Sequence, residues 1–244
     1  MSLDDVNDKK THNLRQRQYF EGVHKKTMVP VESNYLHRHI EQVLRFVELT
    51  SKDRVIEVGC GMGRYTMLLA EYGVNVTGLD LSRVLLGRLG EYSAGRFEIP
   101  LIAAELEHPP IKLHDGFDVV MGFFMLHHLH NLSSGLTGVC QLLKPGGRVV
   151  FLEPNPFNPL YYLQILLTPG MTWADERGML RMRPEIVFQA MREAGLESHA
   201  YFHFGCLPPQ IVNQRWGAML EGICEIFPVL RGLRPFTLFK GQLH

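Results

Sequence analysis

The glycine-rich stretch VIEVGCGMGRYTMLLA (55–70) constrains the fold more than any other part of the chain. An apolar, strand-like run leads into Gly59, Gly61 and Gly63, and a helix-like run follows at once. Glycine adopts positive φ without strain and lets a ligand approach the backbone closely. A strand, a glycine turn and a helix in this order are typical of nucleotide-binding α/β sheets. We therefore expect the turn to hold a ligand, the alternative being a tight turn that binds nothing.

Strand-like and helix-like segments alternate after the turn, which predicts an α/β protein. Strands are expected in RVIEVG, NVTGLD, FEIPLIAA, FDVVMGFF and RVVFLEP, and helices in RYTMLLAEY, SRVLLGRLGEYS and HNLSSGLTGVCQLL. Ser82 suits the N-cap of the second helix, whereas Pro100 weakens the third strand. The pattern favours a doubly wound, mostly parallel sheet that binds ligands beyond the carboxyl ends of its strands.

The segments outside this core are less regular. Residues 1–15 are expected to be disordered and residues 16–49 helical; later segments predict a helix at 184–195 and strands in ESHAYFHF and RPFTLFKG. Residues 208–227, which include Trp216, carry apolar side chains at helical spacing. We expect this helix to pack in the core, with a lid over an apolar substrate or a lipid-contacting face as alternatives. Few basic residues flank it, so strong binding to an anionic membrane is not expected.

Two carboxylates indicate the kind of ligand that the turn would hold. Glu57 lies two residues before the turn, where it would repel a pyrophosphate and attract a cationic, amino-acid-like group. Arg64 stands where the dinucleotide fingerprint has its third glycine, which argues against an NAD(P) oxidoreductase. Asp80, at the end of the next strand, is placed to accept both hydroxyls of a ribose. A ribose, a cationic tail and no phosphate together predict S-adenosylmethionine. The alternatives are loop capping by Glu57 and helix capping by Asp80.

Five motifs in order resemble the class I S-adenosylmethionine-dependent methyltransferases, in particular the ubiquinone/menaquinone-type domain. These are EVGCGMG, GLDLS, AELEHPPI, FDVVMGFFMLHHL and LLKPGGRVVFLEPN, and they cover about residues 50–155. The resemblance implies a Rossmann-like, seven-stranded sheet with an antiparallel last strand and a helical cap. It also implies a set of cofactor-binding residues, in which Glu105 replaces the usual Asp: Glu57, Gly59, Cys60, Gly61, Gly63, Asp80, Leu81, Glu105, Leu106 and Phe123.

The resemblance also suggests how the chain is organised. We expect one methyltransferase domain over residues 1–244, with an N-terminal helical cap at 16–49 and a cofactor-binding core at 50–155. Residues 156–183 and 205–234 would be insertions that cap the substrate. The aromatic character of these segments predicts a small, partly apolar acceptor, methylated on O, N or C. A module that binds S-adenosylmethionine without catalysis is the alternative.

Candidate residues around the acceptor are fewer. The resemblance and the aromatic content of the cap segments suggest Tyr19, Tyr161 and Trp173 as substrate contacts. His127 is the candidate general base, because histidine titrates near neutral pH, and a hydrogen-bonded scaffold role is the alternative.

Composition excludes several other classes of protein. Twenty-five basic residues balance 25 acidic ones, so a nucleic-acid partner is not favoured. The four cysteines lie far apart, which predicts neither a metal site nor a disulfide framework and suits a cytoplasmic protein. No apolar run is long enough for a membrane span. The sequence leaves the oligomeric state open.

Overall fold

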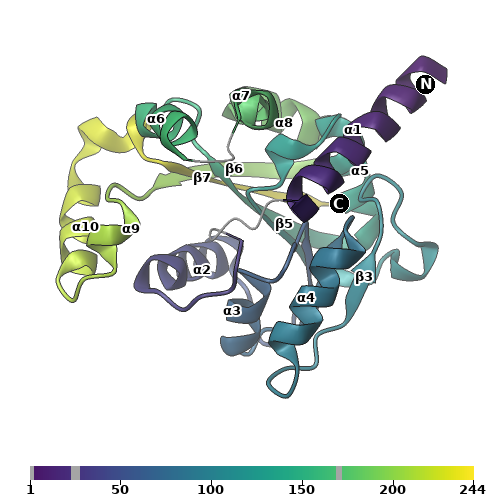
Figure 1. The fold of residues 1–244 in the computed structure, drawn as a ribbon, viewed down its shortest axis with the longest axis horizontal. Coiled ribbons are helices and arrows are strands. Elements are labelled where there is room, and N and C mark those ends of the chain that lie inside the picture. The colour runs from purple at the N-terminus through teal and green to yellow at the C-terminus, as the bar shows by residue number, and fades with distance from the viewer. Residues whose placement is uncertain (1–2, 23–27, 169–171) are drawn as a thin grey trace.

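A seven-stranded sheet forms the centre of the computed structural model, which describes residues 3–22, 28–168 and 172–244. The strand order is β3-β2-β1-β4-β5-β7-β6, and β7 runs antiparallel to both of its neighbours (Figure 1). The predicted doubly wound sheet with an antiparallel last strand is therefore confirmed. The strands are β1 (Val55–Val58), β2 (Val76–Asp80), β3 (Leu101–Ala103), β4 (Phe117–Phe123), β5 (Leu143–Pro154), β6 (Leu196–Phe204) and β7 (Phe236–Leu243).

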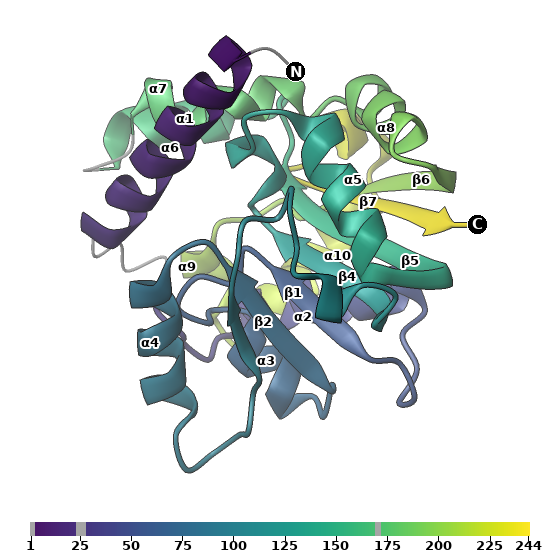
Figure 2. The same ribbon diagram turned by 90° about the vertical axis from the view of Figure 1, so that its right-hand side faces the viewer.

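Helices cover both faces of the sheet (Figure 2). One face packs against the apolar stripe of α2, whose N-cap is Ser33; the other packs against α5 and α8. Ser82 caps α4 as predicted, by accepting a hydrogen bond from the amide of Leu85. The helices of eight or more residues are α1 (Leu3–Gly22), α2 (Asn34–Val47), α4 (Arg83–Ser93), α5 (Leu132–Leu142), α6 (Pro159–Leu167), α8 (Pro184–Glu193) and α10 (Gly217–Ile226). The shorter ones are α3 (Thr66–Glu71), α7 (Trp173–Glu176) and α9 (Pro209–Val212), with short 3-10 helices at η1 (Ile111–Leu113), η2 (Leu126–His128), η3 (Arg177–Arg181) and η4 (Pro228–Leu233).

The expected disorder of residues 1–15 is wrong for the part that the structure describes, because Leu3–Gly22 forms the single helix α1. This helix has no apolar stripe for a sequence pattern to reveal. Polar contacts with distant loops hold it instead. His12 Nε2 donates to the carbonyl of His128 at 2.9 Å, and Lys9 Nζ lies 3.2 Å from His108 Nε2.

The continuous core helix expected at 208–227 is also wrong. The segment breaks into α9 and α10 at Asn213–Trp216, and a Cβ on Gly217 would lie 2.0 Å from the carbonyl oxygen of Ile211. The apolar side chains of α10 face outward rather than into the core: Met219 is 65% exposed and Ile226 is 73% exposed.

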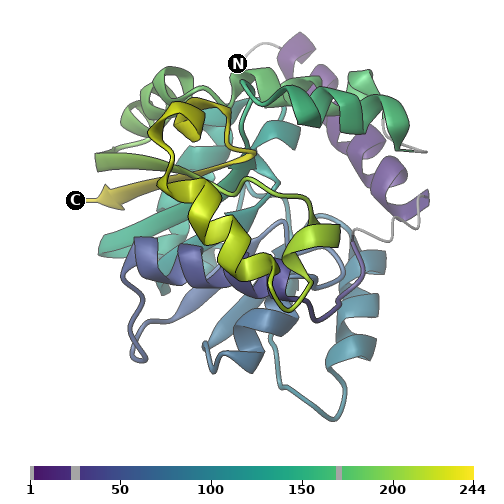
Figure 3. The same cartoon turned by 90° about the vertical axis from the view of Figure 1, so that its left-hand side faces the viewer.

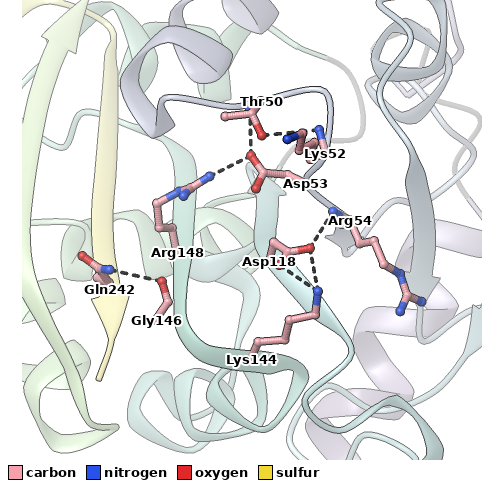
Figure 4. A network of polar contacts seen from close by, with 9 residues as sticks. All are labelled: Thr50, Lys52, Asp53, Arg54, Asp118, Lys144, Gly146, Arg148 and Gln242. Atoms are coloured by element: carbon pink, nitrogen blue, oxygen red, sulfur yellow. Dashed lines mark hydrogen bonds and ion pairs between the residues drawn. The ribbon is translucent and has the colours of Figure 1, made fainter.

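Ion pairs join the amino ends of the central strands, at the end of the sheet away from the glycine turn (Figure 4). Asp118 on β4 accepts hydrogen bonds from Lys144 Nζ at 2.8 and 2.9 Å and from the amide of Arg54 at 2.8 Å. Arg148 on β5 donates to Asp53 at 2.8 Å. This network ties β1, β4 and β5 together without touching the cavity described below.

No helix in the described ranges combines the length and the apolar character needed to cross a membrane.

Candidate functional site

A cavity of about 920 Å³ lies beyond the carboxyl ends of β1, β2, β3 and β4. The loops that follow these four strands form its floor, and residues of α1, α2, α6 and the 206–210 loop form its walls. In Figure 2, α1 and α6 lie across the cavity region from α4. Small-molecule sites span roughly 300–1,000 Å³, so this cavity has room for a cofactor and a second ligand together.

The glycine turn shapes the floor of the cavity. Gly59, Gly61 and Gly63 all have positive φ, at 69°, 54° and 91°. A Cβ on Gly61 would meet no atom within 4 Å, so this residue presents open backbone to the cavity. Gly63 does not line the cavity. A Cβ there would lie 2.2 Å from Leu89 Cδ1, so Gly63 lets the turn pack closely against α4.

Glu57 is a buried carboxylate in the cavity wall and is only 2% exposed. Its Oε2 atom has no hydrogen-bond partner among the described residues. Burial penalises the charged form, and the nearby carboxylate of Asp80 repels it further. Together they outweigh the Thr66 hydroxyl, which lowers the pKa, and raise the pKa of Glu57 from 4.5 to about 8. A buried carboxylate with one oxygen left without a partner gains most from a ligand that brings a positive charge.

Asp80 fixes the shape of the turn and the start of α4. Its Oδ2 accepts a hydrogen bond from the amide of Gly61, and its Oδ1 accepts one from the amide of Ser82, both at 2.8 Å. Burial raises the pKa of Asp80, although these amides oppose the shift. Since Ser82 is the N-cap of α4, the alternative role of Asp80 as the capping residue does not hold.

Most of the predicted site residues lie together around this one cavity. In addition to Glu57, Gly61 and Asp80, the lining includes Gly59, Cys60, Leu81, Glu105, Leu106, Phe123, His127 and Tyr161. Tyr19 and Trp173 are not among the lining residues. Phe20, next to Tyr19, lines the cavity instead, whereas Trp173 is 47% exposed and lies against Tyr162 with ring centroids 6.0 Å apart.

His127 lies between two carboxylates that come from distant parts of the chain. Its Nδ1 donates to Glu153 Oε2 at 2.5 Å, and its Nε2 lies 3.5 Å from Glu176 Oε2. Burial alone would lower the pKa of His127, but the two carboxylates outweigh it and raise the pKa to about 9. The histidine is therefore an imidazolium at neutral pH.

Glu153 and Glu176 hold His127 in different ways. Glu153, on β5, also accepts the amides of Met125 and Leu126 at 2.9 and 2.7 Å, so it fixes the ring and its loop from behind. Glu176, on α7, lines the cavity and accepts a hydrogen bond from the Tyr161 hydroxyl at 3.1 Å. The sequence predicted no metal. Among the described residues, one group of possible ligand atoms lies close together: atoms of His127, His128 and Glu176 are within 4.8 Å of one another.

Sequence reasoning missed an aromatic wall next to the turn. The Tyr65 ring stacks on Phe123 with centroids 4.2 Å apart, and its hydroxyl lies 2.8 Å from Nδ1 of His39. Burial, together with Arg64 and Arg38, lowers the pKa of His39 to about 3, so this histidine is neutral. The signal was present, since His39 lies within the apolar stripe of α2, where a polar residue needs a specific partner.

Comparisons with known proteins agree with this architecture. The family profile described as "Methyltransferase domain" matches residues 32–200. A ubiquinone biosynthesis O-methyltransferase of Aromatoleum aromaticum is 31% identical over 151 residues, which cover 59% of this chain and 64% of that protein. An S-adenosyl-L-methionine-dependent Diels-Alderase, iccD of Talaromyces variabilis, is 29% identical over 51% of this chain and 44% of its own length.

Solved structures share the fold. A Thermotoga maritima protein described as a SAM-dependent methyltransferase, possible histamine N-methyltransferase, aligns over 86% of this chain and 92% of its own, with a TM-score of 0.62 and 16% identity. The family profile covers more than half of the chain, and the solved structure shares its fold. The chain belongs to the class I S-adenosylmethionine-dependent methyltransferase family.

Proposed function

We propose that this chain transfers the methyl group of S-adenosylmethionine to a hydroxyl oxygen of a small, partly apolar molecule. One observation carries the proposal: a single cavity joins the carboxylate-lined glycine turn to an apolar cap, and the His127–Glu176 pair lies in its wall. The name of the O-methyltransferase relative supports oxygen as the attacking atom.

The cofactor would occupy the floor of the cavity. Glu57 would bind the ammonium group of the methionine tail, and Arg64, which also lines the cavity, would bind its carboxylate. Asp80 would accept the ribose hydroxyls, with Glu105 and Leu106 at the adenine. Gly61 and the backbone of Phe123 would lie along the ligand. This arrangement gives the otherwise costly carboxylate of Glu57 the positive partner that it lacks.

The transfer itself depends more on the positions of the two reactants than on acid–base catalysis. The acceptor oxygen attacks the methyl carbon in line, the O–CH₃ bond forms as the CH₃–S bond breaks, and the sulfur leaves as a neutral thioether. Holding the two reactants in line and excluding water supplies most of the acceleration. The hydroxyl proton would pass to Glu176, whose carboxylate is oriented by Tyr161 and whose charge is balanced by the His127 imidazolium.

The acceptor would lie under the cap. Leu160 and Leu163 of α6, Phe20 of α1, and Leu207 and Pro208 line this part of the cavity. Such a lining suits an apolar body that carries one reactive hydroxyl. Arg17 and Arg64 are the arginines among the lining residues, too few for a nucleic-acid surface, so we propose a small-molecule acceptor. We also propose a reducing, cytoplasmic setting, which the four free cysteines support.

Product formation tests the proposal. The purified chain, given S-adenosylmethionine and a panel of apolar phenols, enols and aliphatic alcohols, should release S-adenosylhomocysteine with at least one of them. Glu176→Gln should lower kcat by roughly 10²–10⁴-fold, the range for a lost acid–base group, with an unchanged Kd for S-adenosylmethionine. Tyr161→Phe is the matched control, because it keeps the carboxylate and should cost far less. Full activity of Glu176→Gln would rule out Glu176 as the group that accepts the hydroxyl proton.

A cofactor-binding module without methyl transfer remains the second candidate, and the Diels-Alderase relative shows why it needs a direct test. Binding of S-adenosylmethionine by calorimetry, with no thioether product from any acceptor that also binds, would favour this second function.

A further inference from the structure

The helix α10 is oriented with its acidic face inward and its apolar face toward solvent. Glu221 is only 1% exposed, whereas Met219 and Ile226 are 65% and 73% exposed. Trp216, Ile223 and Phe227 extend the same apolar stripe and are 45–56% exposed. A surface helix in water normally presents the opposite arrangement. An apolar environment outside the protein would therefore stabilise the outward stripe.

Specific polar contacts fix this orientation. Glu221 accepts hydrogen bonds from the amides of Cys206 and Leu207, at 2.9 and 2.8 Å. Glu225 accepts the amide of Gly205 at 2.8 Å and pairs with Arg38. Rotating α10 to bury its apolar stripe would leave both carboxylates and three loop amides without their hydrogen-bond partners. The exposure of the stripe is thus built into the fold.

Helix α6 carries further exposed apolar side chains above α10 in the view of Figure 3. Figure 3 shows α10 crossing the face turned to the viewer, with α6 above it. Leu166 and Leu167 of α6 are 82% and 71% exposed, and residues 155–168 contain no charged side chain. We call the exposed stripe of α10, with Leu166 and Leu167, the apolar cap face.

We propose that the apolar cap face docks on the surface of a lipid bilayer, with the exposed apolar stripe supplying most of the binding and anionic lipids strengthening it. Since few basic residues flank the stripe, anionic lipids alone would not bind it strongly. Between residues 206 and 234, among side chains that the structure describes, Arg215 and Arg231 are the exposed charged groups, and both are positive. The acidic groups there point inward, as shown above. Trp216 follows Arg215 in the sequence and both are exposed. Aromatic and basic residues of this kind suit the boundary between lipid tails and headgroups.

The cap face also adjoins the cavity. Leu160, Leu163 and Leu167 line the cavity on the same short helix that exposes Leu166 outward. An apolar acceptor would therefore pass from the bilayer into the cavity past α6. This route rests on the proposed function, whereas docking itself does not.

Vesicle binding tests the proposal with neither cofactor nor acceptor present. The whole chain is mixed with vesicles of phosphatidylcholine and phosphatidylglycerol in equal parts, or of phosphatidylcholine alone, and separated by flotation. We expect binding to the mixed vesicles, severalfold weaker binding without the anionic lipid, and at least a tenfold loss for Ile226→Glu. Ile111→Glu is the matched control. It is 85% exposed, and it follows β3 at the edge of the sheet opposite β6, so it should bind as the unmodified chain does.

Intrinsic fluorescence gives a second readout, because both tryptophans of the chain, Trp173 and Trp216, are exposed in the cap region. Docking should shift their emission to shorter wavelength and allow quenching by brominated acyl chains. The proposal is overturned if the unmodified chain neither floats with the mixed vesicles nor changes its emission, or if Ile226→Glu and Ile111→Glu lose binding equally. It is also overturned if Ile226→Glu dissociates a dimer while vesicles have no effect, since the cap face would then be an interface between copies.

Discussion

Replacing Glu57 by Gln should stabilise the ligand-free protein and weaken its binding of S-adenosylmethionine. The pKa of Glu57 rises from 4.5 to about 8 on folding. At about 1.36 kcal/mol for each factor of ten in acidity, carrying this charge in the empty site costs roughly 5 kcal/mol. Gln keeps the shape and removes the charge.

The sign of the pH dependence follows from proton binding. Between pH 4.5 and 8 the unfolded chain has released the Glu57 proton but the folded chain still holds it. The free energy of unfolding therefore falls as pH rises through this window, by up to about 1.36 kcal/mol per pH unit. Glu57→Gln has no such proton. The difference in unfolding free energy between variant and unmodified protein should grow in favour of the variant by roughly 3–4 kcal/mol from pH 5 to pH 8.

Urea denaturation at pH 5, 6, 7 and 8 measures this difference. A buried Gln amide adds its own penalty of about 1–3 kcal/mol, but that penalty is the same at every pH and leaves the slope unchanged. Glu105→Gln is the control for the pH dependence, because it makes the same chemical change at a carboxylate that lines the same cavity but is only half-buried. Calorimetry should show proton release when S-adenosylmethionine binds below pH 8, and at least tenfold weaker binding to Glu57→Gln. A flat difference across pH, together with unchanged cofactor affinity, would refute the reasoning.

Three further predictions test other parts of the structure. Asp80→Ala should weaken binding of S-adenosylmethionine by about 1–3 kcal/mol in calorimetry, the scale for losing hydrogen bonds to a charged group, and unchanged affinity would contradict the ribose assignment. Gly63→Ala should lower the free energy of unfolding by more than about 1 kcal/mol, because the new methyl group would collide with Leu89 at a positive φ, whereas Gly61→Ala should mainly weaken cofactor binding. Asp118→Asn should lower the free energy of unfolding by up to about 1 kcal/mol at pH 7, with unaltered cofactor affinity. Lys144 and the Arg54 amide lower the pKa of Asp118, so this stabilisation is present above about pH 4 and falls as the pH drops through the lowered pKa. A difference that does not shrink at all between pH 7 and strongly acidic pH would argue against it.

Chain order and local pattern were enough to predict the floor of the cavity. The glycine turn, Asp80 and the loops after four parallel strands all meet at the carboxyl edge of the sheet, because parallel strands bring their ends together. Glu153 and Glu176 could not be predicted in the same way. They reach His127 from β5 and α7, 26 and 49 residues further along the chain, and no spacing rule links such positions.

The sequence by itself determined the α/β class, the glycine turn and the carboxylates around it, since each depends on the periodicity and spacing of neighbouring residues. Only the tertiary structure decided which way α10 faces. Its helical spacing of apolar residues favoured a core helix, yet the loop amides at 205–207 and Arg38 draw its carboxylates inward and leave the apolar stripe outside. Periodicity reports that a helix has two different faces. Which face is buried depends on partners that the rest of the chain supplies.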